Sequence, residues 1–258
     1  MTVLRSRDNP RVKRWATLVG DKRARKKAGR VLVEGPHLLA AALERGLQPV
    51  DILVTEEALA IDENRRLIAK GKKAPVLVSQ AVLRAIVDAE TPQGIAAELG
   101  MPDLSAPHEG DEVFLEGIQD AGNVGAILRS AAGFGIGRVV LDKDCADAWS
   151  PKVLRAGAGA HFALHIRQVA ALVEDLEKFR GKLICTVPRG GISLRDADLA
   201  GRLGWIFGAE GAGVSIATQR RAALKVRIAI HPLTESLNVA MAAAICLYQG
   251  FNRAGAGS

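Results

Sequence analysis

Short apolar segments alternate with helix-forming segments through the second half of this chain, and this alternation constrains the fold more than any other feature. Strands are predicted over 112–118, 138–141, 182–187, 204–207 and 224–230. Helices are predicted over 123–134, 151–156, 169–179 and 238–251. Strands that are joined through helices run parallel, and a parallel sheet is buried on both of its faces. We therefore expect an α/β fold with a mainly parallel sheet covered by helices.

The residues before this region repeat the alternation on a smaller scale and predict a small α/β domain of their own. Its strands are expected over 31–33, 51–55, 76–79 and 94–98, and its helices over 10–19, 36–45, 62–70 and 81–87. A basic turn is expected between the first helix and the first strand. The stretch MPDLSAPHEGD, at 101–111, has the composition of a linker. The predicted division is a domain over 1–103, a linker over 104–111 and a domain over 112–258.

Composition excludes several classes of protein. No apolar run reaches the roughly 18 residues that a membrane helix needs, and the N-terminus lacks the apolar segment of a secretory signal. The three cysteines, Cys145, Cys185 and Cys246, lie far apart and form no CxxC pair. The five histidines form no HxxxH pair, so no metal site is expected. A reducing cytoplasm is the expected location.

Positive charge is concentrated at one end of the chain. Residues 1–30 hold eleven basic and two acidic residues, a net charge of +9, whereas the whole chain carries +7. Such a concentration predicts a polyanion partner, although a solvated helix face or a disordered tail is the ordinary alternative. Aromatic residues make up 4% of the chain, which favours contacts to RNA phosphates over base stacking. The candidate RNA-binding residues are Arg5, Arg7, Arg11, Lys13, Arg14, Arg23, Arg25, Lys26 and Lys27.

The usual nucleotide-binding and hydrolase fingerprints are missing, and three other stretches carry polar residues at strand ends. The first, QDAGNVGAILRSAAGFGIG, follows the predicted strand 112–118. Asn123 is predicted to cap the next helix at the edge where α/β proteins bind ligands. Arg129 lies among small apolar residues of that helix and must reach water or meet an anion. An ordinary cap and a surface arginine are the alternative interpretation.

The second stretch, WIFGAEGAGVS, carries an apolar strand into a glycine-rich loop that contains Gly208, Glu210 and Gly211. Glycines there permit positive φ and a close approach of backbone to a ligand, although a simple turn has the same composition.

The third stretch, VRIAIHPLTESLNVAMAAAICLY, places Ser236 and Asn238 where the last helix begins. Both side chains suit a helix cap, and a well-capped buried terminal helix explains the pattern equally well.

Taken together, the order and spacing of these stretches resemble the SpoU (TrmH-like) RNA ribose methyltransferases of the SPOUT class. The resemblance rests on N-x-G-x-x-x-R from Asn123, F-G-A-E-G from Phe207 and E-S-L-N-V from Glu235, and it covers about residues 112–252. It implies a trefoil knot in the second domain. The first domain resembles the L30e-like substrate-binding domain of this family, through Asn9-Pro10-x-x-Lys13 and Val33-Glu34-Gly35.

The resemblance also implies a cofactor and residue roles. S-adenosylmethionine is the implied cofactor, held by Gly208, Ile228, Leu237, Glu210, Gly211 and Asn238. The polar residues implied around the reacting ribose are Asn123, Arg129, Glu210, Ser236 and Asn238. Where the family usually has a proline after the isoleucine, this chain has Ala229, so the path of that loop is less rigidly set. A guanidinium group does not give up its proton in proteins and so makes a poor base, and we expect Arg129 to clamp the phosphate beside the target ribose.

The resemblance predicts methylation of a ribose 2′-hydroxyl in structured RNA, with 23S rRNA preferred. The alternatives are a tRNA 2′-O-methyltransferase and a non-catalytic RNA-binding or ribosome-assembly protein on the same scaffold. The family implies a homodimer. The alanine-rich last helix is a candidate interface element, and packing within one chain is the alternative explanation for its small residues.

Overall fold

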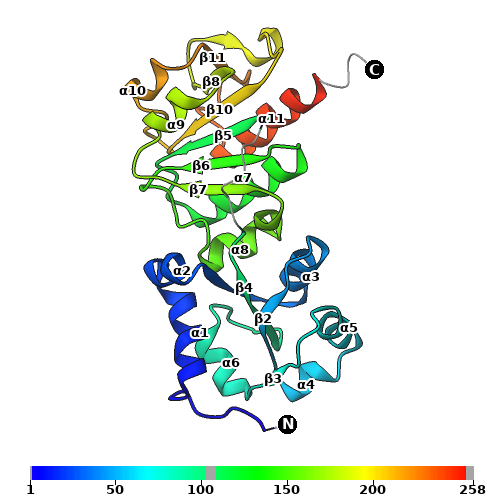
Figure 1. Ribbon diagram of the computed structural model, residues 1–258. Helices are drawn as coiled ribbons and strands as arrows, with labels where there is room; N and C mark the ends of the chain where they lie inside the picture. Colours follow the sequence, from blue (N-terminus) through cyan, green and yellow to red (C-terminus); the bar gives the residue numbers. More distant parts are fainter. Residues whose placement is uncertain (1, 103–108, 254–258) are drawn as a thin grey trace. The chain divides into compact units, whose positions relative to one another are not determined.

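The computed structural model describes residues 2–102 and 109–253 (Figure 1). The chain forms two compact units, one made of Met1–Asp103 with Trp149–Phe162 and the other of Leu104–Ala148 with Ala163–Ser258. Residues 149–162 fall inside the predicted second domain, yet they pack with the first unit. Most of the predicted linker, 104–108, lies outside the described residues.

The first unit contains a four-stranded sheet in the order β1-β4-β2-β3, in which β4 is antiparallel to β1 and β2. Its strands are β1 (Arg30–Glu34), β2 (Pro49–Val54), β3 (Val76–Leu77) and β4 (Ile95–Gly100). Its helices are α1 (Pro10–Gly20), α2 (Lys22–Ala28), α3 (Pro36–Glu44), α4 (Glu56–Leu59), α5 (Asp62–Lys70), α6 (Gln80–Ile86), α8 (Pro151–Gly157) and the 3-10 helix η1 (Ala160–Phe162). The predicted elements are present, and the short helix α4 was not predicted.

The predicted basic turn is wrong, because the segment between α1 and β1 forms helix α2. The side chain of Asp21 accepts hydrogen bonds from the N–H groups of Arg23 and Ala24, and Gly29 ends the helix at φ 60°. Lysine, arginine and alanine are all good helix formers, so a capped run of them becomes a helix. The basic residues of α1 and α2 therefore belong to ordered helices and do not form a disordered tail.

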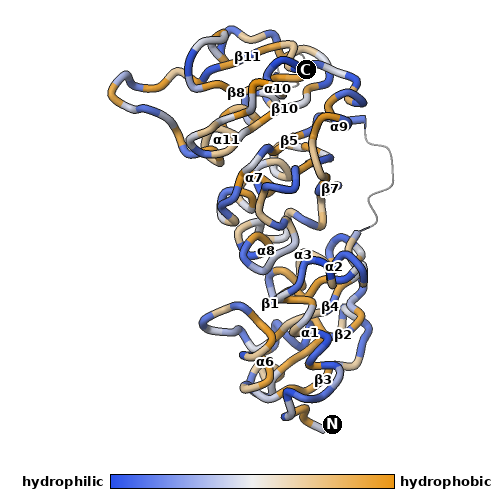
Figure 2. Tube along the Cα trace, turned by 90° about the vertical axis from the view of Figure 1, so that its left-hand side faces the viewer, coloured by the Kyte–Doolittle hydropathy of each residue, from blue (hydrophilic) through white to orange (hydrophobic). Residues whose placement is uncertain are grey.

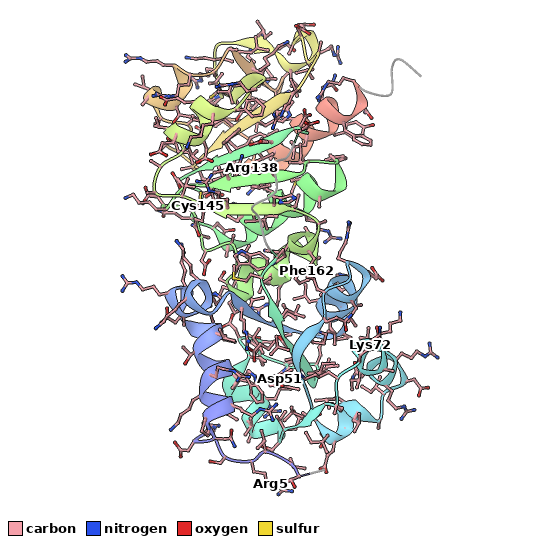
Figure 3. All side chains as sticks on the ribbon, viewed as in Figure 1. Arg5, Asp51, Lys72, Arg138, Cys145 and Phe162 are labelled. Carbon is pink, nitrogen blue, oxygen red and sulfur yellow. The ribbon has the colours of Figure 1, made fainter. Side chains whose placement is uncertain are left out.

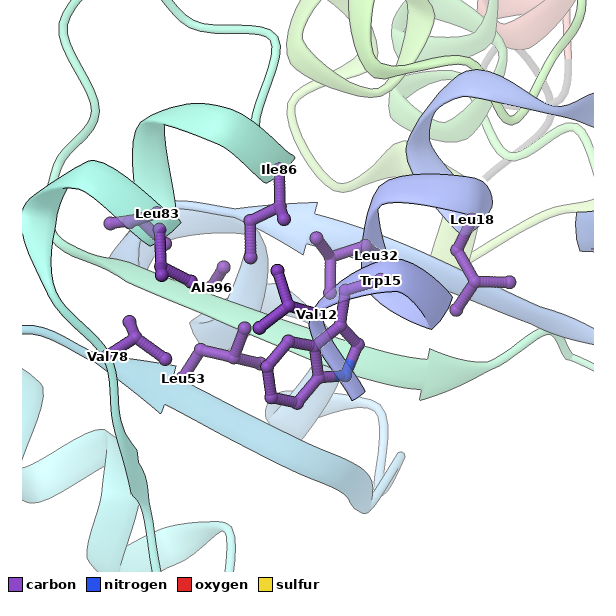
Figure 4. Packing of buried hydrophobic residues seen from close by; sticks show 10 residues of the cluster. Val12, Trp15, Leu18, Leu32, Leu53, Val78, Leu83, Ile86 and Ala96 are labelled. Atoms are coloured by element: carbon purple, nitrogen blue, oxygen red, sulfur yellow. The ribbon is translucent and has the colours of Figure 1, made fainter. Parts of the chain in front are cut away.

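Helix α1 is also part of the core of the first unit. Val12, Trp15 and Leu18 project from one face of α1 into a cluster with residues of the sheet and α6 (Figure 4). Trp15 is fully buried. Burial of this face explains why the apolar residues interleave with the charges at helical spacing.

The second unit confirms the predicted parallel sheet. Its strand order is β7-β6-β5-β10-β8-β11-β9, and every recorded strand pair is parallel. The strands are β5 (Glu112–Glu116), β6 (Arg138–Leu141), β7 (His165–Gln168), β8 (Lys182–Thr186), β9 (Ile192–Ser193), β10 (Leu203–Gly208) and β11 (Leu224–Arg227). Its helices are α7 (Ala121–Gly133), α9 (Val173–Lys178), α10 (Ile216–Gln219), α11 (Val239–Asn252) and the 3-10 helix η2 (Leu194–Asp196). Strands β7 and β9 were not predicted, and the helix predicted over 169–179 is shorter.

Both faces of this sheet are covered by helices. On one face the ring of Phe114 packs edge-on against Phe179, which follows α9, at 5.7 Å between ring centroids. On the opposite face Trp205 packs against α11. The contact is so close at Gly250 that a Cβ there would come within 3.2 Å of the indole. Hydrophobic residues accordingly dominate the central strands in Figure 2. Among the described residues, no helix has both the length and the apolar character needed to cross a bilayer.

Candidate active site

A cavity of about 320 Å³ opens at the carboxyl ends of β8, β10 and β11, which are adjacent in Figure 1. This is the edge at which parallel α/β sheets bind ligands. The residues that line it are Thr186, Val187, Pro188, Gly208, Ala209, Glu210, Gly211, Gly213, Val214, Val226, Ile228, Ile230, Glu235, Ser236, Leu237, Asn238, Val239 and Ala242. All the residues that the sequence assigned to the cofactor are among them.

The loop after β10 folds back onto the end of its own strand. A Cβ at Gly208 would lie 2.2 Å from the carbonyl carbon of Gly213 and 2.3 Å from the nitrogen of Val214. The N–H of Gly213 donates to the carbonyl of Ala209 at 2.8 Å. Gly208 therefore has no room for a side chain. The close approach that the sequence predicted is made by the loop itself.

Aliphatic side chains form one wall of the cavity. Val226, Ile228 and Ile230 recur at every second position after the start of β11, and all three line the cavity. Leu237 lies on the loop that leads into α11 and is 36% exposed. Ile228 thus reaches the cavity although Ala229 replaces the usual proline.

The predicted helix cap at Asn123 is wrong. Helix α7 is capped by Asp120, whose carboxylate accepts from the N–H of Asn123 at 2.7 Å. Because Asp120 serves as the cap, the side chain of Asn123 is free for other contacts. Its Nδ2 donates to the carboxylate of Glu210, and its Oδ1 accepts from Nδ2 of Asn238 at 2.9 Å.

Asn238 caps α11, as the sequence predicted. Its Oδ1 accepts from the N–H groups of Ala240 at 2.9 Å and Met241 at 3.3 Å. The hydrogen bonds therefore run in one direction, from the N–H groups of α11 through Asn238 and Asn123 to Glu210. The carboxylate of Glu210 is the final acceptor of this chain, and it lies on the wall of the cavity.

Of the polar residues expected around the ribose, three line the cavity, namely Glu210, Ser236 and Asn238. Asn123 does not line it but bonds to Glu210 and Asn238, and Arg129 lies apart from all of them. Ser236 lines the cavity, whereas Arg129 is exposed on α7, six positions and about 9 Å of helix beyond Asn123. The guanidinium of Arg129 makes no hydrogen bond or ion pair with any described residue. Its guanidinium is left available to a ligand outside the unit.

The prediction that Arg25 binds RNA is wrong. Arg25 is 4% exposed, and its guanidinium donates to the carbonyls of Leu18 and Val19 at the end of α1. It stabilises the junction of α1 and α2 and is not accessible to a polyanion. The sequence could not distinguish it from its exposed neighbours.

Arg11 and Arg14 are also engaged within the first unit. Both pair with Asp51, at 2.8 Å in each case, and Arg14 pairs with the fully buried Glu98 at 2.7 Å. Asp51 is labelled in Figure 3. The candidate residues that keep exposed side chains without a partner in the described chain are Arg5, Arg7, Arg23, Lys26 and Lys27. Lys13 is exposed but pairs with Asp8 at 2.9 Å.

None of the cysteines is suited to nucleophilic chemistry. Burial raises the pKa of the Cys145 and Cys246 thiols to about 12 and that of Cys185 to about 11. A thiol with such a pKa is not ionised at neutral pH, and the thiolate is the reactive form.

Sequence reasoning missed one wall of the cavity. Thr186, Val187 and Pro188 lie where β8 ends, next to the end of β10. A signal was present, because both strands were predicted and the carboxyl ends of parallel strands meet at one edge.

Comparisons with known proteins agree with this geometry. The SpoU rRNA Methylase family matches residues 112–248, and an MRM3-like substrate binding domain matches residues 9–97. An uncharacterised tRNA/rRNA methyltransferase of Synechocystis is 37% identical over 254 residues, which cover 95% of this chain and 91% of that protein. RlmP of Bacillus subtilis, a 23S rRNA (guanosine(2553)-2′-O)-methyltransferase, is 32% identical over 250 residues, which cover 96% and 98%.

A solved structure is similar along almost the whole chain. The AdoMet-bound rRNA methyltransferase from Sinorhizobium meliloti has a TM-score of 0.81 at 25% identity and covers 98% of each chain. Sheet and cavity together define an α/β protein with a cavity at the carboxyl edge of a parallel sheet. The chain belongs to the SpoU rRNA methylase family. The family, the enzyme class and the S-adenosylmethionine cofactor expected from the sequence are thereby confirmed.

Proposed function

We propose that this enzyme transfers a methyl group from S-adenosylmethionine to a ribose 2′-hydroxyl of 23S rRNA. The observation that carries the proposal is the hydrogen-bonded chain in which Asn123 links two residues of the cavity wall, Asn238 and Glu210. Three polar side chains from remote parts of the sequence converge there. RlmP, which aligns along nearly the whole chain, is named for this reaction.

The cavity residues fit the cofactor. The volume of the cavity, about 320 Å³, falls in the range of about 300–1,000 Å³ that is typical of ligand pockets. When bound, S-adenosylmethionine supplies an electrophilic methyl group on a sulfonium. Ile228 and Leu237 provide apolar surface that solvates such a charge poorly. Gly208 lets the glycine loop fold back against its own strand at the cavity, Gly211 lies on that loop, and Glu210 and Asn238 supply polar contacts.

The polar chain positions a group that can accept the ribose proton. The carboxylate of Glu210 keeps lone pairs beyond the one used by Asn123, so it is suited to accept a hydrogen bond from a 2′-hydroxyl. Asn123 and Asn238 fix its position, and Ser236 lies on the same wall. Holding the hydroxyl in line with the methyl group supplies much of the rate gain in such transfers.

Arg129 is assigned to the RNA and not to the cofactor. Its exposed guanidinium has no partner among the described residues, and a phosphate beside the target ribose would supply one. Arg129→Lys should lower methyl transfer at least tenfold, because Lys cannot form the bidentate contact. S-adenosylmethionine affinity, measured by calorimetry, should remain within twofold. Near-full activity of the Lys variant would contradict the clamp.

The exposed cations of the first unit provide contacts to the RNA backbone. Arg5 (labelled in Figure 3), Arg23, Lys26 and Lys27 are exposed, and binding to phosphates is the ordinary use of such a set. Structured RNA is recognised mainly through its shape and backbone. A cytoplasmic location belongs to the same proposal.

A second copy of the chain is proposed to cover one face of α11. Met241, Ile245 and Tyr248 follow one another at helical spacing and are 56%, 41% and 53% exposed. An apolar stripe of this kind on a capped helix is typical of a twofold interface. Sedimentation equilibrium should give a mass of twice 27.3 kDa.

The decisive experiment uses the purified enzyme with labelled S-adenosylmethionine and three RNAs: 23S rRNA, 16S rRNA and bulk tRNA. Mapping of 2′-O-methyl groups should place one new site in 23S rRNA. Transfer to tRNA alone would favour the alternative target. If labelled S-adenosylmethionine binds but no RNA is modified, the catalytic proposal is wrong.

A further inference from the structure

Glu116 makes a concentrated set of hydrogen bonds at the carboxyl end of β5. Its Oε2 accepts from the N–H of Ser215 at 2.8 Å. Its Oε1 accepts from the hydroxyls of Ser215 and Thr218, each at 2.8 Å. Three donors from one short segment thus converge on a single carboxylate that lies 99 residues earlier in the chain.

The segment held by Glu116 closes the glycine loop of the cavity. Ser215 follows the cavity residue Val214 directly and caps α10, and its Oγ accepts from the N–H of Thr218 at 3.3 Å. Thr218 is 3% exposed, so its hydroxyl is fixed in the interior. Glu116 itself does not line the cavity.

The loop between these points has little of its own to define its shape. Gly211 and Gly213 have positive φ values of 85° and 67°, and an added Cβ at either would meet nothing within 4 Å. Glycine loses more backbone freedom on ordering than any other residue. Within the loop, Gly213 donates to Ala209 and Asn123 contacts Glu210; its ends are held at Gly208 by close packing and at Ser215 by Glu116.

We propose that Glu116 is a positioning residue for cofactor binding, which holds the glycine loop in its binding shape before the ligand arrives. The proposal rests on the cavity being the cofactor site. The carboxylate acts through Ser215 and Thr218 and touches neither substrate nor cofactor. A preformed loop lowers the ordering cost of binding, so the effect appears in affinity.

The residue that follows β5, Gly117, offers a matched comparison. The N–H of Gly117 donates to both carboxylate oxygens of Asp142 at 3.1 Å, and Asp142 also accepts from the N–H of Cys145 at 3.0 Å. Asp142 therefore anchors the same strand end with a similar number of hydrogen bonds. It holds the turn after β6, which lies outside the cavity.

The test combines five variants with measurements of cofactor binding, amide exchange, steady-state kinetics and stability. Glu116→Met removes every acceptor at nearly constant length, and Asp142→Leu does the same at the control site. Glu116→Gln keeps an oxygen for the Ser215 N–H, and Thr218→Val removes one hydroxyl donor while Glu116 stays in place. The dissociation constant of S-adenosylmethionine is measured by calorimetry, and amide exchange of residues 209–215 is measured without any ligand.

Glu116→Met should raise the dissociation constant at least tenfold and KM for the cofactor in parallel, with kcat changed less than threefold. Its loop amides should exchange faster in the ligand-free protein. Glu116→Gln should recover most of the affinity, and Thr218→Val should lose about threefold. Asp142→Leu should lower stability yet leave the dissociation constant within twofold.

Two results separate failure of this inference from failure of the proposed site. If Ile228→Ala weakens cofactor binding but Glu116→Met does not, or if Asp142→Leu weakens binding equally, Glu116 has no positioning role. If Ile228→Ala leaves the affinity unchanged, the cofactor binds elsewhere and the proposed site is wrong. Should Glu116→Met fail to fold, Thr218→Val decides the question: a loss of affinity of about threefold supports the positioning role, and an unchanged affinity contradicts it.

Discussion

The two edges of the parallel sheet in the second unit are built in contrasting ways. At the amino edge, Glu112 opens β5 and is 3% exposed between Arg202 at 2.7 Å and Arg138 at 3.4 Å. Arg138, labelled in Figure 3, also pairs with Asp175 at 2.7 Å. At the carboxyl edge stand a glycine loop, an apolar wall and the polar chain that ends at Glu210.

The difference separates charges that hold the fold from polar groups that remain available to a ligand. At the amino edge the charged groups have partners within the unit, so their bonding capacity is used. At the carboxyl edge Glu210 keeps free lone pairs and the residues of the glycine loop line a cavity. The same distinction applies in the first unit, where Arg14 is paired and Lys26 is not. A charged residue can contact a ligand only where folding has left part of its hydrogen-bonding capacity unused.

The largest expected effect comes from the amino edge. Glu112→Ala removes the carboxylate and leaves Arg138 and Arg202 partly buried without it, which should cost about 3 kcal/mol of unfolding free energy. Urea denaturation measures this loss. Calorimetry of the same variant should find S-adenosylmethionine affinity within twofold of wild type. A tenfold loss of affinity would show that the two edges are not independent.

A smaller effect on stability and a larger one on binding are expected at the carboxyl edge. The Cβ of Gly208→Ala would lie 2.2 Å from backbone of Gly213, so the loop must move. Cofactor affinity should fall at least tenfold, or about 1.4 kcal/mol, and the unfolding free energy by about 1 kcal/mol. Gly133→Ala is the control, because a Cβ there meets nothing within 4 Å. Equal affinities for the two variants would remove the role assigned to the loop.

Local patterns predicted most of the fold, because each element depends on its own residues. The helix predicted over 62–70 and the strand over 138–141 have those bounds in the structure. Strands β7 and β9 were not predicted, because they are short and are stabilised by pairing with the neighbouring strands β6 and β11. Helix α2 was not predicted, because a short run of charged residues is also typical of a turn. The cap at Asp21 is the feature that distinguishes it as a helix.

The residues of the site that belong to a motif could be predicted from the sequence. Contacts between residues far apart in the sequence could not. Gly208, Ile228 and Leu237 line the cavity, as the family motifs implied. Nothing near Glu116 in sequence indicates its bonds to Ser215. Single-sequence reasoning also cannot choose between Asp120 and Asn123 as the cap of α7, because both are good cap residues and three positions separate them.

The smallest expected effect concerns pH and sharpens the account of the amino edge. Desolvation by burial raises the pKa of Glu112, and this outweighs the opposing effect of Arg138 and Arg202. A carboxyl group whose pKa is higher in the folded protein favours folding below its unfolded pKa, and this contribution disappears as pH rises through the folded pKa. Relative to Glu112→Gln, the wild-type protein should therefore lose unfolding free energy as pH rises from 4 towards 7. Urea denaturation of both proteins across this range measures the difference, and cofactor affinity of the two should stay parallel throughout. A rise in unfolding free energy over the same pH range would mean that the ion pairs with Arg138 and Arg202 outweigh desolvation. Charge attraction would then stabilise the amino edge of the sheet.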